Sequence, residues 1–351
     1  MKKILNKIIV ITVVAALLLP GYMQAGNKDR TGEAGASQLL INPWAKSSGW
    51  NGANVACAFG LESLFSNVAG LAFTPGTEVS FNHTQWLKGA EIGIYNMGIA
   101  QRVGPGSVLG ASIMTMSFGD IPITRVDLPE GGVGNFSPKY LVINLAFAKA
   151  FSNSIYGGFN FKILNESMSN LSATGVALDA GIQYVTGVKE NIKFGIALKN
   201  IGPTMRYTGD GLSIQTFLPG NDNQFTMDIR SSAFELPTQL FIGGSYALDF
   251  AEIHQITFAG AFISNAFGKD QFVFGLEYGL SDYLQVRGAL TYEDGIFDNA
   301  ERTTVFTGPS AGITVQAPLN SEKSTMFAVD YSFRATNPFG GVHCIAARLN
   351  F

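Results

Sequence analysis

The chain has 351 residues and a net charge of −3 at pH 7, and only 14% of its residues are charged. A soluble domain carries roughly 25% charged residues, and a weakly acidic chain gives no support for nucleic-acid binding. Hydrophobic residues make up 46% of the sequence, yet no apolar run approaches the roughly 20 residues that a membrane-spanning helix needs. High apolarity without such a run favours a transmembrane β-barrel.

Residues 1–25 have the pattern of a secretory signal peptide. Three lysines precede an apolar core over residues 8–19, Pro20 ends that core, and residues 23–25 (Met-Gln-Ala) form a small-residue cleavage site. A membrane anchor is the alternative, but the core is too short to span a bilayer. We therefore expect a mature chain that starts near Gly26 outside the cytoplasm.

Residues 26–76 are poor in charge and lack the alternation of strands, and we interpret them as a hatch inside the barrel formed by residues 77–351. The hatch ends in Asn67-Val68-Ala69-Gly70-Leu71-Ala72. We expect Asn67 to satisfy backbone groups in a turn and Gly70 to allow close approach to the barrel wall. Asn67, Ala69, Gly70 and Leu71 are therefore the candidate hatch residues.

From residue 77 onward the sequence breaks into segments of about ten residues with a period of two, which is typical of strands. Between Lys139 and Lys149, for example, large apolar residues occupy one face and Asn144 lies on the other. The segments span 77–87, 90–103, 106–118, 138–150, 154–165, 173–187, 191–201, 235–249, 253–265, 270–280, 283–292, 309–318, 325–335 and 342–351. This pattern predicts an all-β transmembrane barrel of about 14 antiparallel strands in the outer membrane of a Gram-negative bacterium.

The links between the predicted strands support the count. If the first strand rises from the periplasm, every periplasmic link is a short turn. The long links, 119–137, 202–234 and 293–308, all fall on the other side. Short periplasmic turns and long extracellular loops are the expected asymmetry of such barrels.

Charged side chains fall on the small, polar face of the predicted strands, which we assign to the lumen. They are Lys162, Asp179, Lys193, Lys199, Glu277, Arg287, Asp330, Arg334 and Arg348. The expected pairs across neighbouring strands are Lys162 with Asp179, Glu277 with Arg287, and Asp330 with Arg348. A charge facing lipid near the midplane would cost about 2–4 kcal/mol, which favours this inward placement.

Two of the long loops carry apolar residues that are costly to expose unless they cover the mouth or meet a partner. The candidates for partner binding are Phe217, Leu218, Pro219, Phe225 and Phe234 in one loop, and Ile121, Ile123 and Leu128 in the other. Packing of the loops on each other as a lid is the alternative.

Catalytic and metal-binding patterns are lacking in the sequence. The three histidines fall on different predicted strands, and a metal site needs clustered ligands. No nucleophile–base set can be named, so we expect neither an enzyme nor a cofactor. Cys57 and Cys344 could pair outside the cytoplasm, although two small buried thiols are the simpler interpretation.

The segment from Gly32 to Ala72 resembles the N-terminal pattern of the PorV/PorQ family. The residues that carry the resemblance are Ala45-Lys46, Gly49, Gly52-Ala53, Val55-Ala56, the Asn67–Ala72 block, and Lys199-Asn200-Ile201-Gly202-Pro203 further along. Lys46 stands where that family usually has arginine, and Val68 where it usually has proline.

The resemblance implies a barrel of the FadL type with an N-terminal hatch in the lumen. It implies a role in type IX protein secretion, with three kinds of partner: the outer-membrane secretion translocon, secreted cargo proteins and the surface attachment complex. The PorV type receives exported cargo and passes it on, whereas the PorQ type holds a surface component at the membrane; the PorV-like role is the favoured expectation. A FadL-like channel for hydrophobic small molecules remains the alternative, because a fold does not by itself decide a function.

Overall fold

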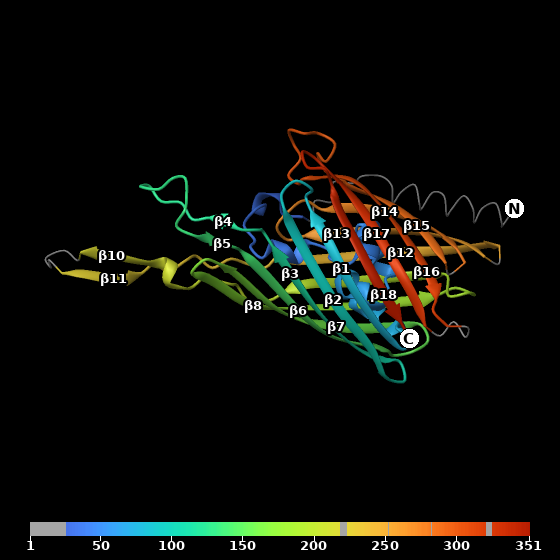
Figure 1. Cartoon of the computed structure of the whole chain (residues 1–351). Helices are drawn as coiled ribbons and strands as arrows, with labels where there is room; N and C mark the ends of the chain where they lie inside the picture. The colour runs from blue at the N-terminus through green and yellow to red at the C-terminus, as the bar shows by residue number, and fades with distance from the viewer. Residues whose placement is uncertain (1–25, 218–222, 252, 282, 321–324) are drawn as a thin grey trace.

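The computed structural model describes residues 26–351 except 218–222, 252, 282 and 321–324, and shows a closed antiparallel β-barrel (Figure 1). The fourteen barrel strands are β1 (Thr77–Trp86), β2 (Ile92–Gly104), β3 (Ser107–Ser117), β6 (Lys139–Ala150), β7 (Ile155–Met168), β8 (Leu171–Thr186), β9 (Ile192–Ile201), β12 (Gln239–Ala251), β13 (His254–Asn265), β14 (Gln271–Leu280), β15 (Leu284–Glu293), β16 (Phe306–Pro318), β17 (Met326–Thr336) and β18 (Val342–Asn350). Each strand pairs with its neighbours along the chain, and β1 pairs with β18 to close the barrel. The predicted fold class and strand count are confirmed.

Strand parity separates the two faces of the wall as the sequence predicts. On β7, Phe159 and Phe161 are exposed on the outside, while Asn160 and Lys162 are buried in the lumen. An outer face of large apolar side chains suits lipid, and a polar inner face is typical of outer-membrane barrels.

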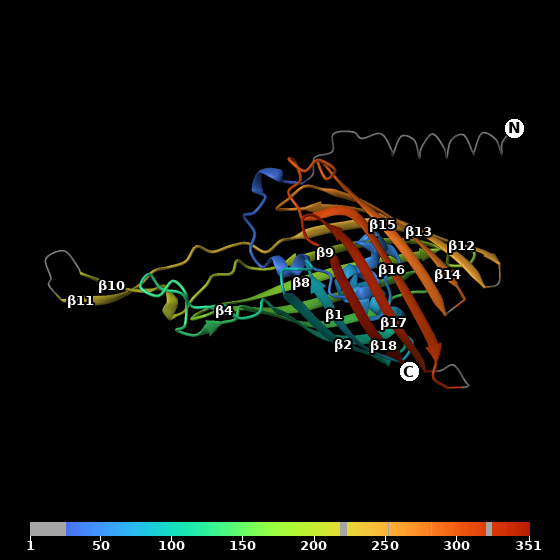
Figure 2. The same cartoon turned by 45° about the horizontal axis from the view of Figure 1, so that its top comes forward.

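The segment before β1 fills the lumen as a series of short helical turns, visible in blue inside the barrel in Figure 2. They are η1 (Lys28–Arg30), η2 (Ser37–Leu40), α2 (Ala45–Trp50), η3 (Ala53–Ala56), η4 (Gly60–Glu62), α3 (Ser63–Ser66) and η5 (Val68–Phe73). The Gly26 N–H donates to Asp270 at the end of the barrel that carries the long loops. Arg102 donates to the Thr74 carbonyl at the opposite rim. The hatch therefore runs through the lumen from the outer mouth to the periplasmic rim.

The long loops contain strands of their own, which the sequence analysis did not predict. β4 (Ile121–Pro122) pairs with β5 (Asn135–Phe136), and β10 (Ser213–Phe217), after η6 (Asp210–Leu212), pairs with β11 (Gln224–Asp228). The β10–β11 hairpin projects far from the barrel in both overall views (Figures 1 and 2). We call the described residues 203–217 and 223–236 the arm.

In the described part of the chain, no helix has the length and apolarity to cross a membrane. Cys57 and Cys344 are both free thiols. Cys344 lies on the inner face of β18, where Thr84 donates to its Sγ at 2.9 Å. Ala45 of the hatch packs over it, so this thiol is covered by the hatch.

Candidate functional site

Asn67 latches the hatch to the barrel wall. It is 1% exposed, and its Oδ1 accepts a hydrogen bond from the Ala69 N–H, which caps η5. Its Nδ2 donates to the carbonyls of Val55 in the hatch, at 2.9 Å, and Ile182 in β8, at 3.0 Å. One amide therefore joins two turns of the hatch to the wall, and asparagine can do so because it is both donor and acceptor.

Gly70 has a different neighbour from the one that the sequence analysis expected. A Cβ at Gly70 would overlap the carbonyl oxygen of Ala58, so the close approach is between two turns of the hatch and not with the wall. The glycine that admits the hatch to the wall is Gly181 of β8, where a Cβ would overlap Asn67 Oδ1. Reasoning from the hatch alone could not find Gly181, because the contact joins residues 114 positions apart.

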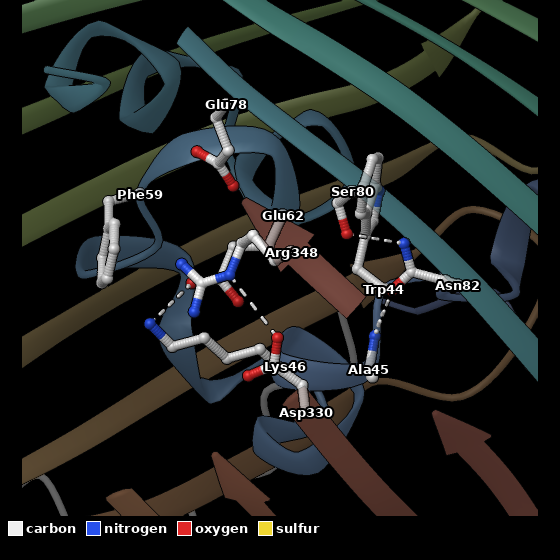
Figure 3. Close-up of a pocket in the computed structure, with 10 residues that line it drawn as sticks. All are labelled: Trp44, Ala45, Lys46, Phe59, Glu62, Glu78, Ser80, Asn82, Asp330 and Arg348. Atoms are coloured by element: carbon white, nitrogen blue, oxygen red, sulfur yellow. Dashed lines mark hydrogen bonds and ion pairs between the residues drawn. The ribbon is translucent and has the colours of Figure 1, made fainter. Parts of the chain in front are cut away.

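One side of the hatch faces a charged part of the wall. Lys46 of α2 and Glu62 of η4 form an ion pair at 3.6 Å, and Lys46 Nζ lies 3.6 Å from the ring centroid of Phe59. Figure 3 shows this pair beside Arg348 and Asp330 of the wall, which pair at 3.5 Å. Burial lowers the pKa of Lys46 and raises that of Glu62, and each partner's charge opposes the other's shift. The pair thus compensates two charges that burial disfavours.

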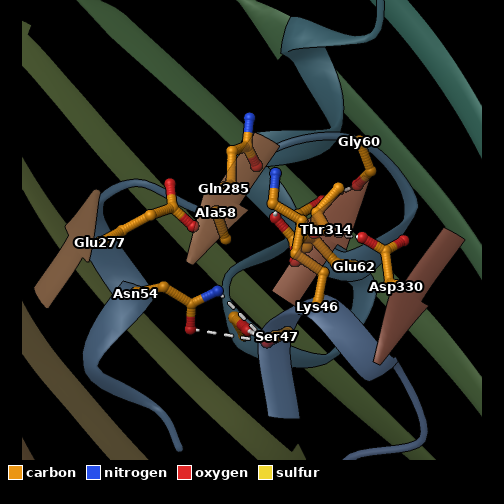
Figure 4. A network of polar contacts seen from close by, with 12 residues as sticks. Lys46, Ser47, Asn54, Ala58, Gly60, Glu62, Glu277, Gln285, Thr314 and Asp330 are labelled. Atoms are coloured by element: carbon orange, nitrogen blue, oxygen red, sulfur yellow. Dashed lines mark hydrogen bonds and ion pairs between the residues drawn. The ribbon is translucent and has the colours of Figure 1, made fainter. Parts of the chain in front are cut away.

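The wall charges form a network over five adjacent strands, part of which is drawn in Figure 4. Arg287 of β15 donates to Glu277 of β14 at 2.7 Å and to Thr314 of β16 at 2.7 Å. Thr314 donates to Asp330 of β17, which in turn pairs with Arg348 of β18. Two of the expected ion pairs are present here, and Thr314, an uncharged residue that the sequence analysis passed over, links them.

The remaining expected charges lie elsewhere in the lumen. Lys162 pairs with Asp179 at 2.6 Å and donates to Asn200 at 2.7 Å. Lys199, also assigned to the lumen, places its ammonium 3.5 Å from the Phe65 ring centroid of the hatch. Two more cations lie over aromatic rings. Lys193 Nζ is 5.3 Å from the Phe73 ring centroid, and Arg334 Cζ is 3.8 Å from the Phe306 ring centroid. Cation–π contacts of this kind stabilise a partly desolvated cation.

The opposite side of the hatch packs on apolar wall. Near the outer mouth, hatch residues contact wall residues of β2, β3, β6, β7 and β8 and two residues of the arm. We call this set the outer apolar cluster: Ala36, Leu39 and Ile41 of the hatch; Ile94, Met114, Met116, Val142, Leu164, Ala173 and Ala177 of the wall; and Met205 and Leu236 of the arm. Its wall residues have lumenal parity, yet they are apolar, unlike Lys162 on the same face of β7.

A second apolar set lies deeper on the same side, and we call it the inner apolar cluster. Its members are Trp44, Leu61, Leu64, Val68, Leu71 and Ala72 of the hatch and Ala100, Val108, Ala146 and Ala148 of the wall. A small cavity of about 30 Å³ lies between the two clusters, with Leu39, Leu64 and Met114 among its lining. The hatch packs directly on the wall backbone here, since a Cβ at Gly110 would lie 2.9 Å from the Leu71 side chain.

Two larger cavities around these elements differ in character. An apolar groove of about 470 Å³ lies on the lipid-facing side of β2, β3, β6 and β7, and includes Leu109, Gly110 and Phe159. A polar cavity of about 310 Å³ opens below the hatch near the periplasmic turns, between Lys46, Glu277 and other polar residues. Both are far larger than the space that one water molecule needs.

The loop candidates fall into two groups. Phe217 is 60% exposed, and Ile121 and Leu128 are also exposed, whereas Phe225 and Ile123 are partly covered. Phe234 instead packs against the outer apolar cluster and lies against Gly35 of the hatch. Leu218 and Pro219 lie outside the described residues.

Comparison with solved structures shows the class of protein that this architecture defines, a plugged outer-membrane barrel. The chain is similar to the CymD monoaromatic hydrocarbon channel (TM-score 0.50, 11% identity, covering 92% of this chain and 97% of that one). It is similar to the Pseudomonas putida toluene transporter TodX (TM-score 0.50, 13% identity, 85% and 95%) and to a Pseudomonas aeruginosa FadL homologue (0.50, 11%, 87% and 98%). No family model matches the sequence, and no curated protein matches it.

The fold is therefore FadL-like, and the protein is a β-barrel of the Gram-negative outer membrane. The FadL-like architecture expected from the sequence is confirmed. Identities of 11–13% establish the fold alone; they assign neither the PorV/PorQ family nor a substrate.

Proposed function

We propose that this protein is an outer-membrane channel for small hydrophobic molecules, which the hatch closes in the state described. The observation that carries the proposal is an apolar path along one side of the hatch, from the outer mouth to the part of the wall around Gly110. The path begins at the outer apolar cluster and continues through the small cavity into the inner apolar cluster.

The path ends at the wall rather than at the periplasmic opening. Beneath the hatch, the large cavity is lined by charged and polar groups such as Lys193 and Glu277. A hydrocarbon there would displace water from these groups without replacing its hydrogen bonds, which costs free energy. At Gly110 and Ala146 the wall is little more than backbone, and the apolar groove lies directly outside it. Exit of an apolar molecule sideways into the membrane is therefore the favoured direction.

The Glu277–Arg348 network lies away from this path, on β14–β18, whereas the two apolar clusters lie on β2, β3, β6, β7 and β8. Lys162 does line the small cavity on the path, and its ammonium is paired with Asp179 at 2.6 Å. The likeness in fold to a toluene transporter and to a monoaromatic hydrocarbon channel supports the same substrate class.

The test is uptake of toluene by Gram-negative cells that express the protein, compared with cells that carry an empty vector. We expect faster initial uptake of toluene and no change for a hydrophilic solute of similar size. Met114→Gln, which places an amide on the path, should reduce the gain, whereas Met227→Gln on the exposed β11 should not. Equal toluene uptake with and without the protein would refute the proposal.

A role in type IX secretion is the second candidate, and the projecting arm favours it. Phe217, Ile214 and Met227 are exposed on a hairpin that extends well beyond the barrel, where a protein partner could cover them. Together with the PorV/PorQ-like segment, this supports binding of a translocon, a cargo protein or a surface attachment complex.

Deleting the gene and assaying cargo secretion separates the two candidates. Lost secretion with normal hydrocarbon uptake would favour the secretion role, and the reverse would favour the channel. Phe217→Ser with Phe225→Ser should weaken capture of a partner in mild detergent without changing barrel assembly, if the arm binds that partner.

A further inference from the structure

The arm and the hatch meet at one buried carboxylate, that of Glu166. It lies near the outer end of β7 and is 3% exposed. One carboxylate oxygen accepts from Gln38 Nε2 of the hatch at 2.9 Å, and the other accepts from the Tyr207 hydroxyl of the arm. Among the described residues, Glu166 forms no ion pair, so these two neutral donors are what compensate the buried charge. Losing a hydrogen bond to a buried charged group costs more free energy than losing one between neutral groups.

A second set of contacts joins the arm to the start of the hatch. The Gly35 N–H donates to the Glu235 carbonyl at 3.1 Å, within a parallel bridge between Ala34 and Glu235. The Glu235 side chain pairs with Arg30 at 2.7 Å. Phe234 lies against Gly35, where a Cβ would overlap its ring.

The arm is anchored to the wall beside this junction. Ser172 of β8 and Thr208 exchange two backbone hydrogen bonds of 2.9 Å, next to Tyr207. β9 ends at Ile201, so the edge of β8 that faces β9 pairs at its outer end with the arm, while its other edge pairs with β7. A β-bridge between Met205 and Phe234 joins the two segments of the arm, 203–217 and 223–236. The positions of the two segments are therefore coupled.

We propose that the arm controls the hatch through Glu166, so that outward movement of the arm releases the hatch segment in the outer apolar cluster. Such movement withdraws the Tyr207 donor and the Glu235 contacts together. The buried Glu166 carboxylate then keeps only Gln38, and the adjoining Leu39 and Ile41 lose part of what holds them in the cluster. This regulation rests on the channel proposed above, because it assigns the hatch the role of its gate.

Cys344 provides a reporter for the hatch that does not depend on transport. Its thiol is 1% exposed and is covered by Ala45 and Pro43 of the hatch. In a Cys57→Ser background, mass spectrometry of the peptide that contains Cys344 gives the rate at which this thiol reacts with N-ethylmaleimide. That rate measures how often the hatch moves away from Cys344.

Tyr207→Phe removes the donor and keeps the ring. We expect it to speed Cys344 labelling about tenfold or more, the factor that corresponds to losing one hydrogen bond to a buried charge. Tyr140→Phe is the matched control, since Tyr140 packs against the same cluster but donates no hydrogen bond to Glu166 in the described structure. Equal labelling of the two variants would overturn the proposal.

A reversible lock tests the direction of the coupling. Ser172→Cys with Thr208→Cys, an opposed pair on β8 and the arm, should form a disulfide that fixes the root of the arm. We expect slower Cys344 labelling in the oxidised than in the reduced form, and the same rate in both would contradict the coupling. Migration of the folded barrel on unheated gels checks that each variant assembles. If labelling responds but no variant takes up toluene, the coupling stands and the channel proposal fails.

Discussion

Replacement of Asn67 by alanine should loosen the whole hatch, because this side chain joins two turns of the hatch to the wall. Asn67→Ala removes the cap on the Ala69 N–H and the two hydrogen bonds to the carbonyls of Val55 and Ile182. The site is 1% exposed, so water does not readily replace these bonds in the closed state.

The expected magnitude follows from the three lost interactions. A helix cap contributes about 1 kcal/mol, and each net hydrogen bond contributes about 1 kcal/mol. The cap and the bond to Val55 lie within the hatch and persist if it leaves as a unit. Only the bond to the Ile182 carbonyl, about 1 kcal/mol, then changes the equilibrium between the closed and the released hatch, by a factor of roughly 5 at 1.4 kcal/mol for each factor of ten.

The assay is again the labelling rate of Cys344 in a Cys57→Ser background. The hatch residue that covers Cys344 is Ala45, which lies more than twenty residues before Asn67 in the chain. The labelling rate therefore responds to Asn67→Ala only if the hatch leaves the lumen as a unit. If Asn67→Ala leaves this rate unchanged, either the latch does not hold the hatch or the hatch does not move as one body, and the reasoning fails.

Three further predictions use the same assay. Gly181→Ala forces a Cβ into Asn67 Oδ1 and should speed labelling about as much as loss of the latch, whereas Gly244→Ala, which meets nothing nearer than 3.5 Å, should not. Glu62→Gln leaves the Lys46 ammonium buried without its anion, which costs about 3–5 kcal/mol and should speed Cys344 labelling at least a hundredfold. Adding Lys46→Met to Glu62→Gln should restore most of the closed state. If it does not, the ion pair is not the cause of the effect. Val68→Pro should leave the Cys344 labelling rate within about threefold of the parent rate, or lower it. Val68 is the first residue of η5, where proline is favoured, and the backbone before it is extended. A large acceleration would show that the Val68 side chain matters more than the turn.

The sequence was sufficient for the barrel because strand parity is a local property. Lys162 and Asp179 share lumenal parity on adjacent strands, and the register places them diagonally, with Asn160 opposite Asp179 and Lys162 opposite Ala177. Their ion pair follows from counting alternate residues. The short and long links added an independent constraint on the number of strands.

The coupling residue Glu166 was missed for a specific reason. The strand was predicted to end at residue 165, whereas β7 continues to Met168. With that extension, Glu166 takes the lumenal parity of Lys162 and Leu164. Apolar residues at lumenal parity, as at Leu164 and Met114, were a readable signal for the outer apolar cluster.

Contacts between the hatch and the wall were beyond sequence reasoning for a physical reason. The contacts of Asn67 with Ile182 and of Gln38 with Glu166 join residues more than a hundred positions apart, and no periodicity relates the hatch to a strand. The arm was likewise interpreted only as a loop, because its two strands have five residues each and alternate weakly.

The most direct test of the central claim fixes the hatch to the wall and measures transport. Ala45→Cys places a second thiol against the native Cys344, which it contacts, and Cys57→Ser removes the other thiol. We predict that cells expressing this variant take up toluene no faster than empty-vector cells when the disulfide is formed, and regain fast uptake on reduction. Equal uptake in the oxidised and reduced forms, with the disulfide verified by mass spectrometry, would contradict the account of the hatch as the gate of a hydrocarbon channel.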